Sequence, residues 1–150
     1  MGLQMDAVAL NAFLAEEFSQ MALGFSILEV NEEGLIARLC VDERHLRPGG
    51  TVSGPTMFGL ADLAIYCVVL SRVGCVPLAV TTNASIDFMR KPEAGRDMRA
   101  ECRMLKLGRK LAIADALIFS EGQSEPVARC SMTYAIPPQV SRDQDLSLGK

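Results

Sequence analysis

Several residue types that build common catalytic and metal sites are scarce in this chain. Its 150 residues include no tryptophan and a single histidine, His45. A zinc site usually draws on histidines and cysteines at ligand spacing, and a Ser-His-Asp triad needs a histidine beside its nucleophile. Neither arrangement has a natural position in this sequence. We therefore expect no metal and no bound cofactor.

The cysteines give no sign of a redox or metal motif. They form no C-x-x-C pair, and their number, five, is odd. Most stand among apolar or strand-like neighbours, which favours buried, reduced thiols and a cytoplasmic protein. These residues are Cys40, Cys67, Cys75, Cys102 and Cys130. The N-terminus has no basic region followed by an apolar core, so we expect no signal peptide.

Charge and size limit the function classes further. The net charge of −3 and the pI near 5.2 argue against general nucleic-acid binding, which requires a basic surface. A chain of 150 residues is most simply one domain, spanning residues 1–150. Because 49% of the residues are hydrophobic, we expect part of the surface to be covered by a second copy of the chain.

One long apolar stretch organises the sequence. Between residues 52 and 70 the only charged residue is Asp62. Ser53 or Gly54 can cap a helix at the start of this stretch, where Pro55 suits the first turn. The helix runs to about residue 72 and ends at Gly74. Since it is apolar on every side, the rest of the chain must enclose it.

Asp62 needs a compensating environment, because burying an ionised carboxylate costs several kcal/mol. At helical spacing, four residues share its face: Phe58, Gly59, Ile65 and Tyr66. This face is typical of a slot that contains a base. Two alternatives remain open: an ion pair between Asp62 and a basic residue elsewhere, or a transmembrane helix. The central acid and the lack of close basic residues before the helix disfavour a membrane span.

The remaining pattern predicts a second helix and a set of strands. Residues 6–21 have the spacing of an amphipathic helix capped by Asp6, which makes the segment 1–20 an N-terminal helix. Alternating or β-branched runs predict strands over 25–31, 35–42, 79–90, 97–107, 111–119 and 126–136, followed by a loose polar tail over 139–150. Hairpin-linked strands and one enclosed helix indicate the α+β class, with an antiparallel sheet wrapped around a long central helix.

The central segment resembles a known family. Residues 53–62, which read SGPTMFGLAD, are similar to the start of the central helix in the hot-dog fold thioesterases, most of all in the branch of PaaI-like enzymes. That branch opens the helix with His-Gly-Gly and carries Leu-Ala-Asp in the register of residues 60–62. Lys91-Pro92, the Gly108-Arg109 turn and the final Ile-Pro-Pro are also similar. The resemblance covers about residues 20–138 and implies a hot-dog fold.

The resemblance implies roles for residues at the start and centre of the helix. Asp62 matches the family's catalytic carboxylate, which acts as general base toward water or attacks the thioester carbonyl directly. Gly54 matches the residue whose backbone N–H polarises that carbonyl. Ser53 stands where the family usually has histidine, and Arg47 where an asparagine is common. Pro55 replaces a second glycine and has no N–H to donate.

Hot-dog proteins form dimers whose sheets join edge to edge, with the site between subunits. The resemblance therefore implies a homodimer or a dimer of dimers, in which Asn83 would face Asp62 of the partner subunit. Candidate substrate-binding residues are Arg47, Phe58, Tyr66, Asn83 and Phe88, and Ile65 and Val69 are further candidates for the acyl slot. Candidate cations for the phosphates of coenzyme A are Arg90, Lys91, Arg109 and Lys110.

Three functional hypotheses follow. The leading one is an acyl-coenzyme A thioesterase that hydrolyses an aromatic or medium-chain acyl thioester, with Asp62 as general base or nucleophile and coenzyme A as part of the substrate. The second is non-catalytic binding or sensing of acyl-coenzyme A on the same fold. The third is a hydratase or dehydratase, which needs a histidine with a carboxylate. Its candidate is His45, which we interpret as a surface histidine in the loop before the helix.

Overall fold

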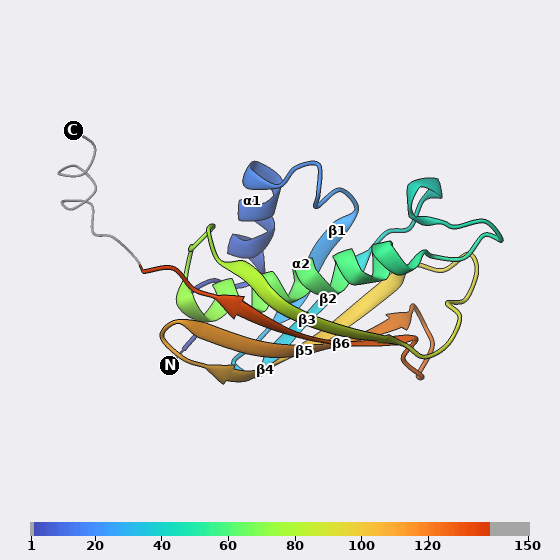
Figure 1. Cartoon of the computed structure of the whole chain (residues 1–150). Coiled ribbons are helices and arrows are strands. Elements are labelled where there is room, and N and C mark those ends of the chain that lie inside the picture. Colours follow the sequence, from blue (N-terminus) through green and yellow to red (C-terminus); the bar gives the residue numbers. More distant parts are fainter. Residues whose placement is uncertain (1, 139–150) are drawn as a thin grey trace.

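A six-stranded antiparallel sheet wraps one long helix in the computed structural model, which describes residues 2–138 (Figure 1). The expected loose tail over 139–150 lies outside the described residues. Along the chain the elements are α1 (Ala7–Glu17), β1 (Phe25–Val30), β2 (Gly34–Leu39), the 3-10 turn η1 (Glu43–His45), α2 (Gly54–Val73), β3 (Val80–Phe88), β4 (Met98–Leu107), β5 (Leu111–Ser120) and β6 (Ala128–Ala135). The predicted α+β architecture is confirmed.

Helix α2 begins and ends where its capping residues predict. The Ser53 hydroxyl accepts a hydrogen bond from the Thr56 N–H, and Gly74 ends the helix with a φ of 91° that glycine adopts without strain. Eleven of its twenty residues are buried, and the sheet curves around the helix (Figure 1). By length and composition α2 could span a membrane, but it is the core helix of the fold. The transmembrane alternative is therefore wrong.

The strand order differs from the chain order. The sheet runs β1-β2-β4-β5-β6-β3, so the chain leaves α2, forms one edge strand and then crosses back to the middle of the sheet. Edge strand β3 pairs with β6 from Val80–Ala135 to Phe88–Ala128. Among the described strands β6 is its only neighbour, and Val80 and Phe88 are both more than half exposed.

The two edges of the sheet are treated differently. At the β1 edge, the Asn11 side chain of α1 bonds the backbone of Ile27 in both directions, at 2.8 and 3.0 Å, next to a bulge in the strand. A side-chain amide thus occupies backbone groups that could otherwise pair with another strand. At the β3 edge, no described element occupies the backbone groups that face away from the sheet. The open edge is therefore the side from which the sheet can be extended.

The five cysteines are all free thiols, as expected, but only some are buried. Cys67, Cys102 and Cys130 lie in the core, where burial raises the pKa of each thiol. Cys40 and Cys75 are exposed. The expectation of buried thiols therefore holds for three of the five.

Candidate active site

Asp62 lies in the wall of a cavity of about 530 Å³ beside α2. The helix contributes a face on which Thr56, Gly59, Asp62 and Tyr66 follow one another. The other walls come from the segment between α1 and β1, from η1, from the segment leading into β3 with the start of that strand, and from single residues of β1, β2 and β6. These walls include Phe18, Gln20, Met21, Leu23, Phe25, Leu39, Arg44, His45, Pro77, Ala79, Val80, Thr81 and Tyr134. The cavity is mostly apolar, with the carboxylate in its side.

Two hydroxyl groups hold one oxygen of the Asp62 carboxylate. Thr81 Oγ1 donates to Oδ1 at 2.7 Å, and the Tyr134 hydroxyl donates to the same oxygen at 2.5 Å. Oδ2 has no hydrogen-bond partner within residues 2–138, and it is not enclosed. The expected alternative of an ion pair is not found, because none of the described basic residues forms a salt bridge with Asp62.

Aromatic rings line one end of this cavity. Phe18 meets Tyr66 edge to face with ring centroids 5.5 Å apart, and Tyr66 lies 6.0 Å from Tyr134. The Tyr66 hydroxyl donates to the carbonyl oxygen of Pro77 at 3.0 Å, so it is occupied away from Asp62. Burial raises the pKa of Tyr66 to about 12. Both tyrosines therefore remain protonated near neutral pH.

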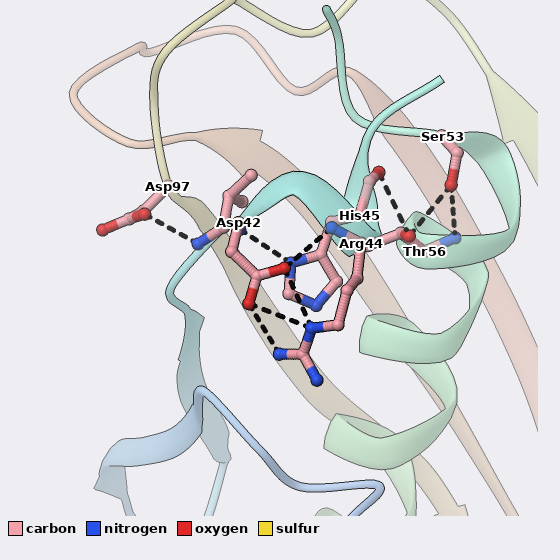
Figure 2. A network of polar contacts seen from close by, with 7 residues as sticks. Asp42, Arg44, His45, Ser53, Thr56 and Asp97 are labelled. Atoms are coloured by element: carbon pink, nitrogen blue, oxygen red, sulfur yellow. Dashed lines mark hydrogen bonds and ion pairs between the residues drawn. The ribbon is translucent and has the colours of Figure 1, made fainter. Parts of the chain in front are cut away.

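Two polar residues of η1, Arg44 and His45, line the opposite end, and Figure 2 shows both beside Asp42. The Arg44 guanidinium binds both carboxylate oxygens of Asp42, a contact that lowers the pKa of Asp42 to about 2. His45 Nδ1 accepts the Asp42 N–H at 3.0 Å, which leaves Nε2 to carry the proton of the neutral ring. The His45 side chain is only 15% exposed. Its interpretation as a surface histidine is wrong, since it lines the cavity that holds Asp62.

A second cavity, of about 630 Å³, lies at the start of α2. It brings together five residues singled out from the sequence: Arg47, Gly54, Phe88, Arg90 and Lys91. The Arg90 guanidinium is partly engaged, since it donates to the Pro126 carbonyl oxygen at 2.5 Å and lies 3.4 Å from a carboxylate oxygen of Glu125. Positive charge and the N-terminus of a long helix thus meet in one hollow, an arrangement that suits a phosphorylated ligand.

Ser53 serves the helix rather than the Asp62 cavity. Its hydroxyl accepts the Thr56 N–H at 3.2 Å and donates to Thr56 Oγ1 at 2.9 Å, and Thr56 in turn donates to the His45 carbonyl oxygen (Figure 2). Ser53 lines neither cavity. This network fixes the entry of the chain into α2 and the position of the Gly54 N–H beside it.

Gly54 and Asp62 do not meet within one chain. They stand eight positions apart on α2, which separates them by about 12 Å along the helix axis. Gly54 lines the second cavity and Asp62 the first, and no residue lines both. A carbonyl in contact with one of them cannot also reach the other in the same chain.

Helical spacing placed two residues on the wrong flank of Asp62. Phe58 and Ile65, at positions −4 and +3, lie some 40 to 60° to one side of the carboxylate, whereas Gly59 and Tyr66, at −3 and +4, lie to the other. Only the second pair lines the cavity. Ile65 and Val69 are fully buried in the core, and Phe58 packs against it, so the expected acyl slot does not include these three side chains.

The remaining predicted residues lie apart from both cavities. Asn83 is exposed on edge strand β3. Arg109 and Lys110 are exposed in the β4–β5 turn, at the end of the sheet where Val80 and Leu111 flank Ala135. Arg90 and Lys91 lie at the other end of the sheet, where Phe88 pairs with Ala128. Ala128 is seven positions from Ala135 on β6, a separation of about 23 Å.

Two residues that hold Asp62 were missed in the sequence. Thr81 stood in a predicted strand without a role, and Tyr134 in the last strand shared the inward alternation of Cys130 and Met132. A buried tyrosine hydroxyl usually needs a polar partner, and Asp62 is the charged group of an otherwise apolar helix. The need of each group for a polar partner was the signal in the sequence that could have predicted the contact between Tyr134 and Asp62. Among the described residues, no group of three or more metal-ligating side chains occurs.

The sequence profile of the thioesterase superfamily matches residues 49–127, a range that contains the start of α2 and Asp62. The chain belongs to the thioesterase superfamily. A candidate esterase of Pseudomonas aeruginosa is 33% identical over 104 residues, which cover 69% of this chain and 75% of that protein. This thioesterase-superfamily chain is a thioester hydrolase, and the predicted enzyme class is confirmed.

Solved structures agree with this assignment. A candidate thioesterase from Silicibacter sp. TM1040 is 57% identical, with a TM-score of 0.84 over 91% of this chain and 94% of that one. The phenylacetic acid degradation protein PaaI of Thermus thermophilus, in the structure of a point mutant, is 26% identical, with a TM-score of 0.69 over 81% and 100% of the two chains. The hot-dog fold and the resemblance to PaaI-like enzymes are thus confirmed.

A more distant neighbour contains a ligand. The structure of a hypothetical thioesterase protein from Streptococcus pneumoniae TIGR4 with coenzyme A is 20% identical, with a TM-score of 0.73 over 85% of this chain and 99% of that one. At this level of identity the likeness shows the shared fold.

Proposed function

We propose that this thioester hydrolase acts on acyl-coenzyme A with an aromatic or medium-chain acyl group, and that Asp62 is its general base or nucleophile. One observation carries the proposal: the Asp62 carboxylate stands in an apolar cavity, with Oδ1 bound by two hydroxyls and Oδ2 left for a reactant. Asp62 is half-buried in mostly apolar surroundings, and a carboxylate held there without a cationic partner favours a chemical role over a structural one.

The cavity supports the proposed acyl group. Its mostly apolar walls and the rings of Phe18, Tyr66 and Tyr134 suit a phenyl ring or a medium-length chain. The second cavity supports coenzyme A, because Arg47, Arg90 and Lys91 can pair with phosphate groups at a helix N-terminus. The neighbour from Streptococcus pneumoniae, which was crystallised with coenzyme A, supports the same ligand.

The proposed active site is completed by a second copy of the chain. If β3 pairs with itself in antiparallel fashion about Ala84, Val80 of one chain faces Phe88 of the partner subunit. Asp62 accepts a hydrogen bond from Thr81 near the N-terminal end of β3, and Gly54 packs on Phe88 at the C-terminal end of that strand. Asp62 would then approach Gly54 of the partner subunit. In the same joined sheet, Arg109 and Lys110 would lie toward the end that holds the partner's Lys91.

Hydrolysis then follows from these groups. The thioester carbonyl oxygen accepts the N–H of Gly54 from the partner subunit, which stabilises the negative charge that develops on it. Asp62 Oδ2 either removes a proton from an attacking water molecule or adds to the carbonyl carbon itself. Collapse of the tetrahedral intermediate breaks the carbon–sulfur bond and releases coenzyme A as its thiol. The oxygen atom of the carboxylic acid product comes from water, which attacks either the thioester itself or an acyl-Asp62 intermediate.

The test is an Asp62→Asn variant in a thiol-release assay with phenylacetyl-, benzoyl-, hexanoyl- and decanoyl-coenzyme A. We expect the rate to fall by about 10²- to 10⁴-fold, the usual contribution of a positioned base. Unchanged turnover would exclude Asp62 from the chemistry. Wild-type protein that binds these thioesters but releases no thiol would instead favour the sensing alternative.

His45 keeps the hydratase hypothesis testable, because the cavity joins an imidazole to a carboxylate. A His45→Gln variant that loses all activity would support this hypothesis, whereas intact thiol release would show that His45 takes no part in thioester hydrolysis. The free cysteines support a cytoplasmic location, which we also propose.

A further inference from the structure

We propose that Tyr134 is a positioning residue for the Asp62 carboxylate: its hydroxyl, together with that of Thr81, holds Oδ1 so that Oδ2 is the oxygen presented to the reactant. This inference rests on the proposed function and adds to it the device that orients the base. Tyr134 lies on β6, the last strand in the chain, which contains none of the motif residues.

The geometry distinguishes the two carboxylate oxygens. Oδ1 receives the Thr81 hydroxyl at 2.7 Å and the Tyr134 hydroxyl at 2.5 Å, whereas Oδ2 receives no hydrogen bond from the part of the chain that the structure describes. The Tyr134 oxygen also lies 3.1 Å from the Asp62 backbone carbonyl oxygen, so it follows the helix as well as the side chain. Rotation of the carboxylate would break both hydroxyl contacts, which fixes the direction in which Oδ2 points.

Tyr134 is suited to this task by its position. The residue is 3% exposed and stands on β6, between β5 and edge strand β3, so its ring cannot swing away. Burial, and then the hydrogen bond to Asp62, raise the pKa of the Tyr134 hydroxyl far above neutral. The hydroxyl therefore remains a donor over the whole working range of the enzyme. A donor to a carboxylate favours its charged form, which is the form that a base or nucleophile needs.

The chain offers a matched control in Tyr66. Its ring lies 6.0 Å from that of Tyr134 and lines the same cavity, but its hydroxyl donates to the backbone of Pro77. Tyr66→Phe and Tyr134→Phe thus remove the same group from neighbouring buried rings. The change at Tyr134 alone frees the carboxylate.

The experiment measures kcat and KM for Tyr134→Phe, Tyr66→Phe and Thr81→Val with the best substrate of the panel. We expect Tyr134→Phe to lower kcat by about 10- to 100-fold with KM changed less than threefold, as for loss of a strong bond to a charged group. Thr81→Val should lower kcat in the same way, because it also removes a donor from Oδ1. Tyr66→Phe, which frees neither carboxylate oxygen, should lower kcat less than Tyr134→Phe.

Thermal unfolding of each variant checks folding, and Thr81→Val carries the test if Tyr134→Phe does not fold.

The outcomes separate this inference from the proposed function. An inactive Asp62→Asn variant combined with a Tyr134→Phe variant whose kcat is no lower than that of Tyr66→Phe would overturn the positioning role alone. An Asp62→Asn variant of full activity would overturn the proposed function, and the positioning role with it.

Discussion

The ring of Phe88, on edge strand β3, lies directly against Gly54, the first residue of α2. A Cβ atom on Gly54 would stand 3.4 Å from the tip of that ring. The contact ties the start of the central helix to the one sheet edge that no described element covers. Because of this contact, a chain that pairs with β3 would also come close to the Gly54 N–H.

The first prediction concerns the open edge. Ala84→Asp puts two like charges opposite each other if β3 pairs with itself about this residue, and such pairs are destabilising. We expect a dimer to become a monomer and thiol release to be lost. Analytical ultracentrifugation and the activity assay measure both effects. Leu28→Asp, on exposed β1 at the other edge, is the control and should keep dimer and activity. A fully active Ala84→Asp monomer would contradict the shared site.

The second prediction concerns the width of the Asp62 cavity. Gly59 lines that cavity on α2, and a Cβ atom there would meet nothing within 4 Å. Gly59→Ala should therefore stabilise the protein by roughly 0.5–1 kcal/mol through helix propensity. Gly59→Leu should fill the cavity and lower kcat/KM for decanoyl- and phenylacetyl-coenzyme A far more than for acetyl-coenzyme A. Denaturant unfolding and the substrate panel measure these effects, and an unchanged substrate preference in Gly59→Leu would place the acyl group elsewhere.

The third prediction concerns the phosphates of coenzyme A. Removing one phosphate contact, in Arg47→Ala or Lys91→Ala, should raise KM by about 3- to 30-fold with little change in kcat, as for a hydrogen bond to a charged group. Added salt should reduce the difference between wild type and variant. The double change of Arg109→Ala with Lys110→Ala tests whether the turn of the other subunit also reaches the ligand. If KM is unchanged in all three variants, the second cavity is not the coenzyme A site.

Much of the architecture follows from local patterns. Capping by Ser53 and the stop at Gly74 fixed the bounds of α2 to within a residue or two, because both act through bonds to the nearest turn. Alternating, β-branched and apolar runs located every strand of the sheet. The position of β3 at the edge could not be read in this way, since it depends on which strands pair after the chain has crossed the sheet.

The candidate site was predictable only where it lies on one helix. Asp62 and Tyr66 were found from their spacing, but spacing alone did not tell which flank of Asp62 faces the core, so Phe58 was misplaced. Thr81 and Tyr134 are 19 and 72 positions from Asp62, and their contacts are products of the assembled sheet. His45 was misjudged because the fold of η1 over the cavity, rather than its sequence, covers most of its side chain.

The fourth prediction concerns acid stability. The Val41 N–H, and then the Arg38 guanidinium at 2.6 Å, lower the pKa of Asp97. A carboxyl group with a lowered pKa stabilises the fold above its unfolded pKa of about 3.9, and this contribution is lost as pH falls through the lower folded value. Between pH 5 and 2, Asp97→Asn should therefore lose less stability than wild type. Asp87→Asn, which alters an exposed pair with Arg129, is the control and should follow the wild-type slope. Equal slopes for Asp97→Asn and wild type would contradict this assignment.

The central claim, that Asp62 of one chain acts with Gly54 of the other, is tested most directly by mixing two inactive variants. Asp62→Asn removes the base, and Gly54→Pro removes the N–H that polarises the carbonyl. After unfolding and refolding together in equal amounts, half of the dimers are mixed, and each mixed dimer has one intact site, so about a quarter of the wild-type rate should return. A mixture that stays as inactive as its two components, although co-purification of differently tagged chains shows that mixed dimers have formed, would contradict the shared site.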